Sequence, residues 1–202
     1  MAETKMTWQI VTLRYGRTNT FLAKGDSGSL LVDTDYAGTM QGLYRELKAN
    51  GIRLKEITWM MATHYHPDHC GLTGLLQAQG IPLLLLDSQV EAVHFPECIF
   101  AREKRAYAPV DPEKAAVLSE EESRPFLKKL GIGGEIIRTP SHSADSVSLI
   151  LDDGSCFVGD LEPREYLGGY AENAPQAGDW AKIMTRHPKM IYYGHAPARA
   201  PE

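Results

Sequence analysis

Three histidines and an aspartate lie within one short stretch, His64-Tyr65-His66-Pro67-Asp68-His69. Imidazole and carboxylate groups are typical zinc ligands, and catalytic zinc sites keep one position open for water. His64 and His66 are two residues apart, so both can point to the same side of an extended segment. Pro67 ends that segment, and the following turn lets Asp68 and His69 reach a second metal beside the first. The stretch therefore predicts a site for two metal ions.

Three later motifs add further candidate ligands. They are Thr139-Pro140-Ser141-His142-Ser143, Val158-Gly159-Asp160 and Tyr193-Gly194-His195. Together with the first stretch, which matches the pattern H-x-H-x-D-H, they resemble in order the motifs of the metallo-β-lactamase superfamily. The resemblance covers residues 12–197, and it is to the small, single-domain, glyoxalase II-like metallo-hydrolases.

The resemblance implies a ligand set and a mechanism. The first metal would be held by His64, His66 and His142, and the second by Asp68, His69 and His195, with Asp160 shared between them. Two divalent ions, zinc before iron or manganese, would lower the pKa of a bridging water to give hydroxide. Asp68 would also act in catalysis by holding or passing a proton.

Departures from related families narrow this interpretation. Ser141 and Ala196 stand where the superfamily usually has glycine, which affects the shape of the pocket rather than the ligands. Asp160 stands where one major class of zinc β-lactamases has cysteine. The chain ends shortly after His195, so we expect no glutathione-binding helical domain of the glyoxalase II type. His66 stands where the flavodiiron reductases have glutamate, which argues against redox chemistry.

The elements that must position these residues can be outlined from hydrophobic patterning. Alternating or densely apolar segments predict strands at 9–14, 19–23, 29–32, 57–62, 81–86, 135–138, 147–151, 156–158 and 190–193. Helical spacing predicts helices at 37–50, 72–79 and 179–186, and we expect residues 87–130 to be mostly helical. The first ligand stretch thus follows a buried strand, and Asp152-Asp153-Gly154 predicts a hairpin.

Strands in two blocks with helices between them predict an α+β fold of two packed, mixed sheets covered by helices. The resemblance implies the same architecture, a four-layer αβ/βα sandwich. We expect one domain over residues 1–202, with a lid-like helical segment at about 88–130.

Composition limits the alternatives. The chain has 202 residues, 43% hydrophobic and 23% charged, with a net charge of −5. An acidic balance does not suggest nucleic-acid binding. Three irregularly spaced cysteines are not a disulfide framework. We see no signal peptide at residues 1–8 and no membrane span, so we expect a cytoplasmic protein. We also expect a small-molecule substrate and no nucleic-acid or membrane partner, and the sequence leaves open whether the protein is a monomer or a homo-oligomer.

Several other residues have a functional and a structural interpretation. Arg102, Lys104 and Arg105 form either a solvated helix face or part of a lid that attracts an anionic substrate. Asp145 and Ser146 either cap or hydrogen-bond near His142, as outer carboxylates do when they orient a ligand, or form a turn and the start of a strand. Tyr192 or Tyr193 could donate a hydrogen bond to an oxyanion. We interpret Cys70, His94 and His187 as packing, helix-end or surface residues.

Three functions fit this sequence. The leading hypothesis is a binuclear hydrolase of a small thioester, lactone or carboxylic ester. The second is a phosphodiesterase or related phosphoryl hydrolase, because two metals suit in-line displacement equally well. The third is a metal-bound binding or sensor protein without turnover.

Overall fold

The computed structural model describes residues 8–169, 171 and 174–201, so residues 1–7, where we expect no signal peptide, lie outside it. Two four-stranded sheets form its centre. The first has the order β1-β2-β3-β4, with bounds Gln9–Leu13, Thr20–Lys24, Ser29–Val32 and Trp59–Met61. The second has the order β10-β9-β8-β7, with bounds Met190–Tyr193, Ser155–Gly159, Val147–Leu151 and Gly134–Arg138.

Both sheets are mixed, as expected. In the first sheet β1, β2 and β3 are antiparallel neighbours, whereas β3 and β4 run parallel. In the second, β7, β8 and β9 are antiparallel and β9 runs parallel to β10. A further parallel pair, β5 (Leu84–Leu86) and β6 (Ala116–Leu118), adjoins β4 through a bridge between Met60 and Leu83.

Successive side chains of a strand face different layers of the molecule. In β3, Leu31 faces the core shared with α1 (Met40–Ala49) and α3 (Thr73–Ala78), while Leu30 and Val32 face the core between the sheets. In β8, Leu149 faces that same central core, and Ile150 faces α6 (Pro175–Met184). Strands buried on both faces are expected where helices cover both outer sides of a pair of sheets.

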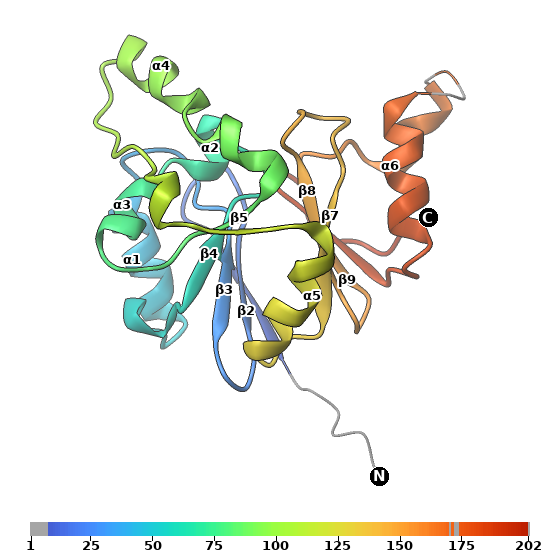
Figure 1. The fold of residues 1–202 in the computed structure, drawn as a ribbon, viewed down its shortest axis with the longest axis horizontal. Coiled ribbons are helices and arrows are strands. Elements are labelled where there is room, and N and C mark those ends of the chain that lie inside the picture. Colours follow the sequence, from blue (N-terminus) through green and yellow to red (C-terminus); the bar gives the residue numbers. More distant parts are fainter. Residues whose placement is uncertain (1–7, 170, 172–173, 202) are drawn as a thin grey trace.

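Figure 1 shows the resulting order of layers, with α1 and α3 outside the first sheet and α6 outside the second. This is the predicted four-layer αβ/βα sandwich. The helix α5 (Glu120–Lys129) packs against β7 and contributes Leu127 to the core between the sheets. Ser119 caps it with a reciprocal capping box to Glu122, which explains why it begins where the acidic run does.

The segment 87–130 is largely helical, as predicted, but contains one strand that we did not expect. Its helical parts are η2 (Asp87–Ala92), α4 (Phe95–Arg102), η3 (Pro112–Lys114) and α5. Between them, β6 pairs with β5, a contact between segments distant in sequence that no local pattern reveals. A remaining 3-10 helix, η1 (Leu54–Glu56), precedes β4, and another, η4 (Arg164–Gly169), follows β9.

No helix among the described residues is long and apolar enough to cross a membrane.

Candidate metal centre

The predicted ligands lie at one edge of the two sheets, where strands end. The loop of His64 and His66 follows β4, and α2 (Pro67–Cys70) carries the next two candidates. Asp160 and His195 follow the parallel strands β9 and β10, whose carboxyl ends lie at the same edge. His142 lies in the connection between β7 and β8. Rigid strands thus fix short loops that present the side chains.

The first cluster consists of His64, His66 and His142. His66 Nδ1 lies 3.0 Å from His64 Nε2 and 3.1 Å from His142 Nε2. His64 is buried, whereas His142 is exposed, so one side of the cluster is open to solvent.

The second cluster consists of Asp68, His69 and His195. His195 Nε2 lies 3.3 Å from His69 Nε2 and 3.1 Å from Asp68 Oδ2. Its buried member is His69, and Asp68 and His195 are both partly exposed.

Asp160 lies between the two clusters. Its Oδ1 is 3.1 Å from His69 Nε2 and 3.4 Å from His195 Nε2. Its Oδ2 turns towards the first cluster, 3.8 Å from His142 Nε2. One carboxylate therefore faces both clusters with a different oxygen, as a bridging ligand would.

These spacings fit metal ligation. Imidazole nitrogens at about 2.0–2.1 Å from a tetrahedral ion are about 3.3 Å apart. The nitrogen pairs in both clusters, at 3.0, 3.1 and 3.3 Å, are close to that value. The structure thus brings all seven predicted ligands together, and their binding of metal stays a prediction.

The second nitrogen of three imidazoles is also engaged. His64 Nδ1 lies 3.2 Å from Thr63 Oγ1, and His69 Nδ1 lies 2.8 Å from Asp33 Oδ2. His195 Nδ1 donates to the backbone carbonyl of Arg17 at 3.1 Å. Outer partners of this kind fix the ring orientation and the tautomer, and they leave Nε2 facing the cluster.

Asp145 joins the two loops that carry the first cluster. Its Oδ2 accepts from the Tyr65 N–H at 2.7 Å, and its Oδ1 accepts from Ser143 Oγ at 2.7 Å. Asp145 thus connects the two loops, and in the described part of the chain it makes no hydrogen bond to the His142 ring. It also lies just before β8, so its position fits the strand-start interpretation as well.

The electrostatics of the two clusters differ. Burial lowers the pKa of His64 far below its usual range and also lowers the pKa of His142. Hydrogen bonds to Asp160 and Asp68 raise the pKa of His195 to about 11. For His69, burial opposes protonation, but Asp33 and Asp160 outweigh it and raise the pKa to about 10. His64 and His142 in the first cluster therefore offer neutral nitrogens, while the carboxylates in the second cluster favour cations.

The comparisons with known proteins agree with this geometry. The family model described as the metallo-β-lactamase superfamily matches residues 13–195. The chain belongs to the metallo-β-lactamase superfamily. A relative described as a probable metallo-hydrolase, from Methanocaldococcus jannaschii, is 31% identical over 71% of this chain and 66% of its own length. The Drosophila melanogaster homologue of beta-lactamase-like protein 2 is 25% identical over 88% of this chain and 58% of its own. The chain thus spans less than two thirds of these curated relatives.

Solved structures of the superfamily share the fold. A metallo-β-lactamase family protein of Thermus thermophilus matches 96% of this chain and 74% of its own, with a TM-score of 0.67 and 20% identity. Another protein, solved in a di-iron-bound form, matches 95% of this chain and 94% of its own, with a TM-score of 0.71 and 22% identity.

Several cavities lie beside the candidate metal centre. One of about 1060 Å³ adjoins the second cluster and is lined by Asp68 and His195. A smaller one of about 410 Å³ lies beside His66 and Phe95. A third of about 390 Å³ lies against His142. The centre is therefore reached from several sides by solvent-filled space large enough for a small molecule.

The remaining candidate residues either line a cavity beside the centre or lie in a hydrophobic core. Tyr193 lines the cavity beside His142, whereas the ring of Tyr192 stacks on Phe157 in the core between the sheets. From the basic cluster, Arg105 lines the cavity of about 1060 Å³. Cys70 is fully buried in a hydrophobic core, as its packing interpretation predicts.

His94 Nδ1 lies within hydrogen-bond distance of the Glu97 carboxylate on the surface, and His187 follows the end of α6 with a φ of 51°. Both positions agree with a helix-end or surface role.

Sequence reasoning missed Asp33 and Arg17, both of which touch the centre's imidazoles. Asp33 follows β3 directly, and this place at the end of a strand is the signal that the sequence offers. The parallel pairing of β3 with β4, which brings Asp33 to the centre, exists only in the folded chain. Arg17 contacts His195 through its backbone carbonyl, and every residue type has that group, so the sequence does not reveal the contact.

Proposed function

We propose that this protein is a binuclear, metal-dependent hydrolase of a small ester-like substrate, namely a thioester, lactone or carboxylic ester. The observation that supports this most is Asp160, whose two oxygens face two separate ligand clusters. The adjoining cavity of about 1060 Å³ provides space for a substrate beside the second cluster. When bound, two divalent ions would lower the pKa of a shared water and polarise the substrate carbonyl. We expect zinc, with iron as the main alternative because one structural relative was solved with two irons.

Different residues of the chain would have different roles in this reaction. His64 and His142 offer neutral nitrogens, and Asp33 fixes the ring of His69. The Asp68 carboxylate, 35% exposed, lies in the cavity wall with Oδ2 beside His195. In the proposed reaction Asp68 would accept a proton from the attacking water and return it to the leaving alkoxide or thiolate.

A hydrolysis panel on metal-loaded protein tests the proposal, with thioesters, lactones, simple esters, phosphodiesters and a β-lactam, beside metal analysis by mass spectrometry. Asp160→Ala removes the shared ligand, and Asp87→Ala removes an exposed carboxylate outside the clusters. We expect two ions per chain and ester turnover in the wild type and in Asp87→Ala, with turnover lost in Asp160→Ala.

Other results would redirect the assignment. Turnover of phosphodiesters without any ester would establish the phosphoryl hydrolase instead. Two bound ions with no turnover of any substrate would favour the binding or sensor role.

A further inference from the structure

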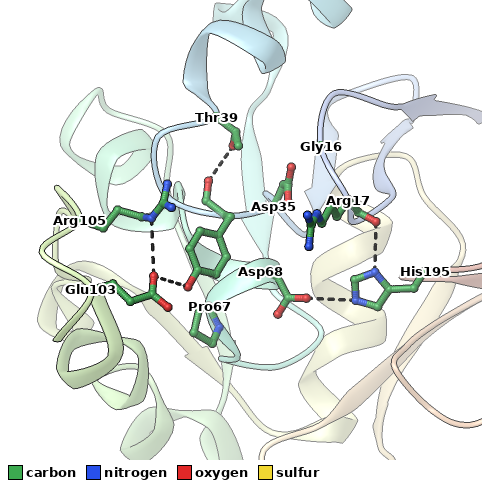
Figure 2. Close-up of a pocket in the computed structure, with 10 residues that line it drawn as sticks. Gly16, Arg17, Asp35, Thr39, Pro67, Asp68, Glu103, Arg105 and His195 are labelled. Atoms are coloured by element: carbon green, nitrogen blue, oxygen red, sulfur yellow. Dashed lines mark hydrogen bonds and ion pairs between the residues drawn. The ribbon is translucent and has the colours of Figure 1, made fainter. Parts of the chain in front are cut away.

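The cavity of about 1060 Å³ is lined by charged side chains of both signs. Its wall includes Arg17, Asp35, Asp68, Glu103 and Arg105, as Figure 2 shows. Which of these charges is already satisfied within the protein determines what the cavity can bind.

Two acidic groups of the wall are paired within the protein. Asp68 pairs with His195 at 3.1 Å. Glu103 accepts from the Tyr36 hydroxyl at 2.7 Å and lies 3.6 Å from Arg105 Nε. Neither carboxylate is therefore left to neutralise a second cation in the cavity.

The third acidic group of the wall, Asp35, is almost fully buried. Burial raises the pKa of its carboxyl group, and the backbone N–H groups of Tyr36, Arg17 and Thr18 oppose that effect only in part. Asp35 therefore carries its charge less readily than an exposed aspartate would, and it attracts a neighbouring cation less strongly.

The two arginines differ. Arg105 donates to the Ala37 carbonyl at 3.1 Å and lies over the Tyr36 ring at 4.8 Å, in addition to Glu103. Arg17 has no hydrogen bond or ion pair from its guanidinium to any residue that the structure describes. In Figure 2 this guanidinium projects into the cavity between Asp35 and Asp68. It is an exposed cation beside the candidate metal centre with no partner of its own among the described residues.

The backbone holds Arg17 firmly, although its guanidinium has no partner among the residues that the structure describes. Its N–H lies against the Asp35 carboxyl group, and its carbonyl accepts from His195 Nδ1. A Cβ on the preceding Gly16 would lie 1.2 Å from Asp35 Oδ2, so a side chain there would displace the Asp35 carboxyl group. The base of the Arg17 side chain is thus fixed relative to the second cluster by one hydrogen bond to a candidate ligand.

We propose that Arg17 recognises a carboxylate carried by the substrate, so that the enzyme acts on anionic esters whose scissile carbonyl lies at the metal centre. One unpaired guanidinium matches one carboxylate in charge and in its planar, two-point geometry. Arg105 forms the far wall and is already neutralised by Glu103. This inference rests on the proposed hydrolase function.

Binding of simple acids to the metal-loaded protein tests the inference without turnover. Isothermal titration compares succinate, glutarate and adipate with the monoacids of equal length, butyrate to hexanoate, in wild type and in Arg17→Gln, Arg17→Lys and Arg45→Gln. The monoacid controls for a carboxylate bound at the metals. Arg45 is an exposed arginine on α1 and provides the matched control for loss of one positive charge.

We expect at least one diacid to bind the wild type about tenfold more tightly than its monoacid, a difference of about 1.4 kcal/mol. Arg17→Gln should abolish that preference, Arg17→Lys should keep part of it, and Arg45→Gln should keep all of it. The inference is overturned if no diacid is preferred, or if Arg17→Gln leaves the preference intact.

Kinetics then extend the test to substrates, with 4-nitrophenyl half-esters of the same diacids against 4-nitrophenyl esters of the monoacids. We expect Arg17→Gln to lower the ratio of kcat/KM for charged over neutral esters at least tenfold, mainly through KM. A wild type that hydrolyses none of these esters would count against the hydrolase function, while the binding comparison would still decide the role of Arg17.

Discussion

At the scale of single residues, Asp33 has the most demanding position in the centre. It is 1% exposed, and its φ of 62° is one that residues other than glycine adopt at a cost. Its Oδ1 accepts from the Thr63 N–H at 2.7 Å, and its Oδ2 accepts from His69 Nδ1 at 2.8 Å. The buried Asp33 carboxylate, on a strained backbone, thus fixes both the backbone at Thr63, just before the first ligand, and the ring of His69.

Replacement of Asp33 by asparagine keeps the size but changes this bonding. The amide oxygen can still accept from the Thr63 N–H, whereas the amide nitrogen cannot accept from His69. We expect the affinity of the second metal to fall tenfold to a hundredfold, the usual effect of losing an outer partner of a ligand, while the first metal is retained.

Competition with a chromophoric chelator measures the two affinities separately in Asp33→Asn. Asp153→Asn is the matched control, because Asp153 also accepts a backbone N–H, that of Ser155, but lies in a hairpin away from the centre. Equal second-metal affinities in the wild type and Asp33→Asn would refute this role.

At the scale of elements, the turn from β9 into Asp160 depends on Gly159. Its φ is +57°, and a Cβ there would lie 2.4 Å from Thr63 Oγ1. That hydroxyl also contacts Asp33 and His64 Nδ1, so a side chain at residue 159 would push against the centre from beneath.

Gly159→Ala therefore combines backbone strain with a clash, and Gly80→Ala separates the two. Gly80 has a φ of +89° with nothing within 4 Å of an added Cβ, so its substitution carries the strain alone, about 1–2 kcal/mol. We expect Gly159→Ala to lower the free energy of unfolding in urea by more than Gly80→Ala, and also to reduce metal content. Equal losses with full metal content would show that Thr63 moves aside without consequence.

The elements also show how far prediction from the sequence extends. The strands at β3 and β8 and the hairpin at Asp152-Asp153-Gly154 were predicted with correct bounds, because local alternation and turn chemistry specify them. The last helix begins earlier than predicted, at Pro175, where proline suits the first turn. β6 was missed because three residues carry no periodicity and the strand exists through its pairing with β5.

The candidate site also has parts that local sequence specifies and parts that depend on contacts between distant segments. The seven ligands could be predicted because motif spacing encodes them, and the structure brings them together. Asp33, Asp35 and Arg17 could not, because they act through parallel strand pairing and through backbone groups.

At the scale of the whole molecule, the candidate ligands come from both halves of the sandwich. The first motif extends from β4 in the first sheet, whereas His142, Asp160 and His195 extend from the second. Ions bound between them would join the two sheets at one edge. Binding to the folded state alone stabilises it, by about 2.7 kcal/mol at a free ion concentration one hundred times Kd.

The size of this stabilisation should depend on pH. In the metal-free protein, the pKa values of His69 and His195 are raised from 6.5 to about 10 and 11. Their protonation stabilises that fold fully below the unfolded value of 6.5, and the contribution is lost as pH rises through 10 and 11. Metal binding has the opposite dependence, because an ion must displace these protons and its affinity therefore rises with pH.

We accordingly expect the difference in Tm between the metal-loaded and the chelator-treated protein to widen as pH rises from about 6 to about 9. Calorimetry across this range measures it, with His187→Gln as a control that removes a histidine outside the centre. The control should reproduce the wild-type slope. A difference in Tm that stays constant with pH would mean that ions and protons do not compete for the second cluster, and that His69 and His195 do not exchange one for the other.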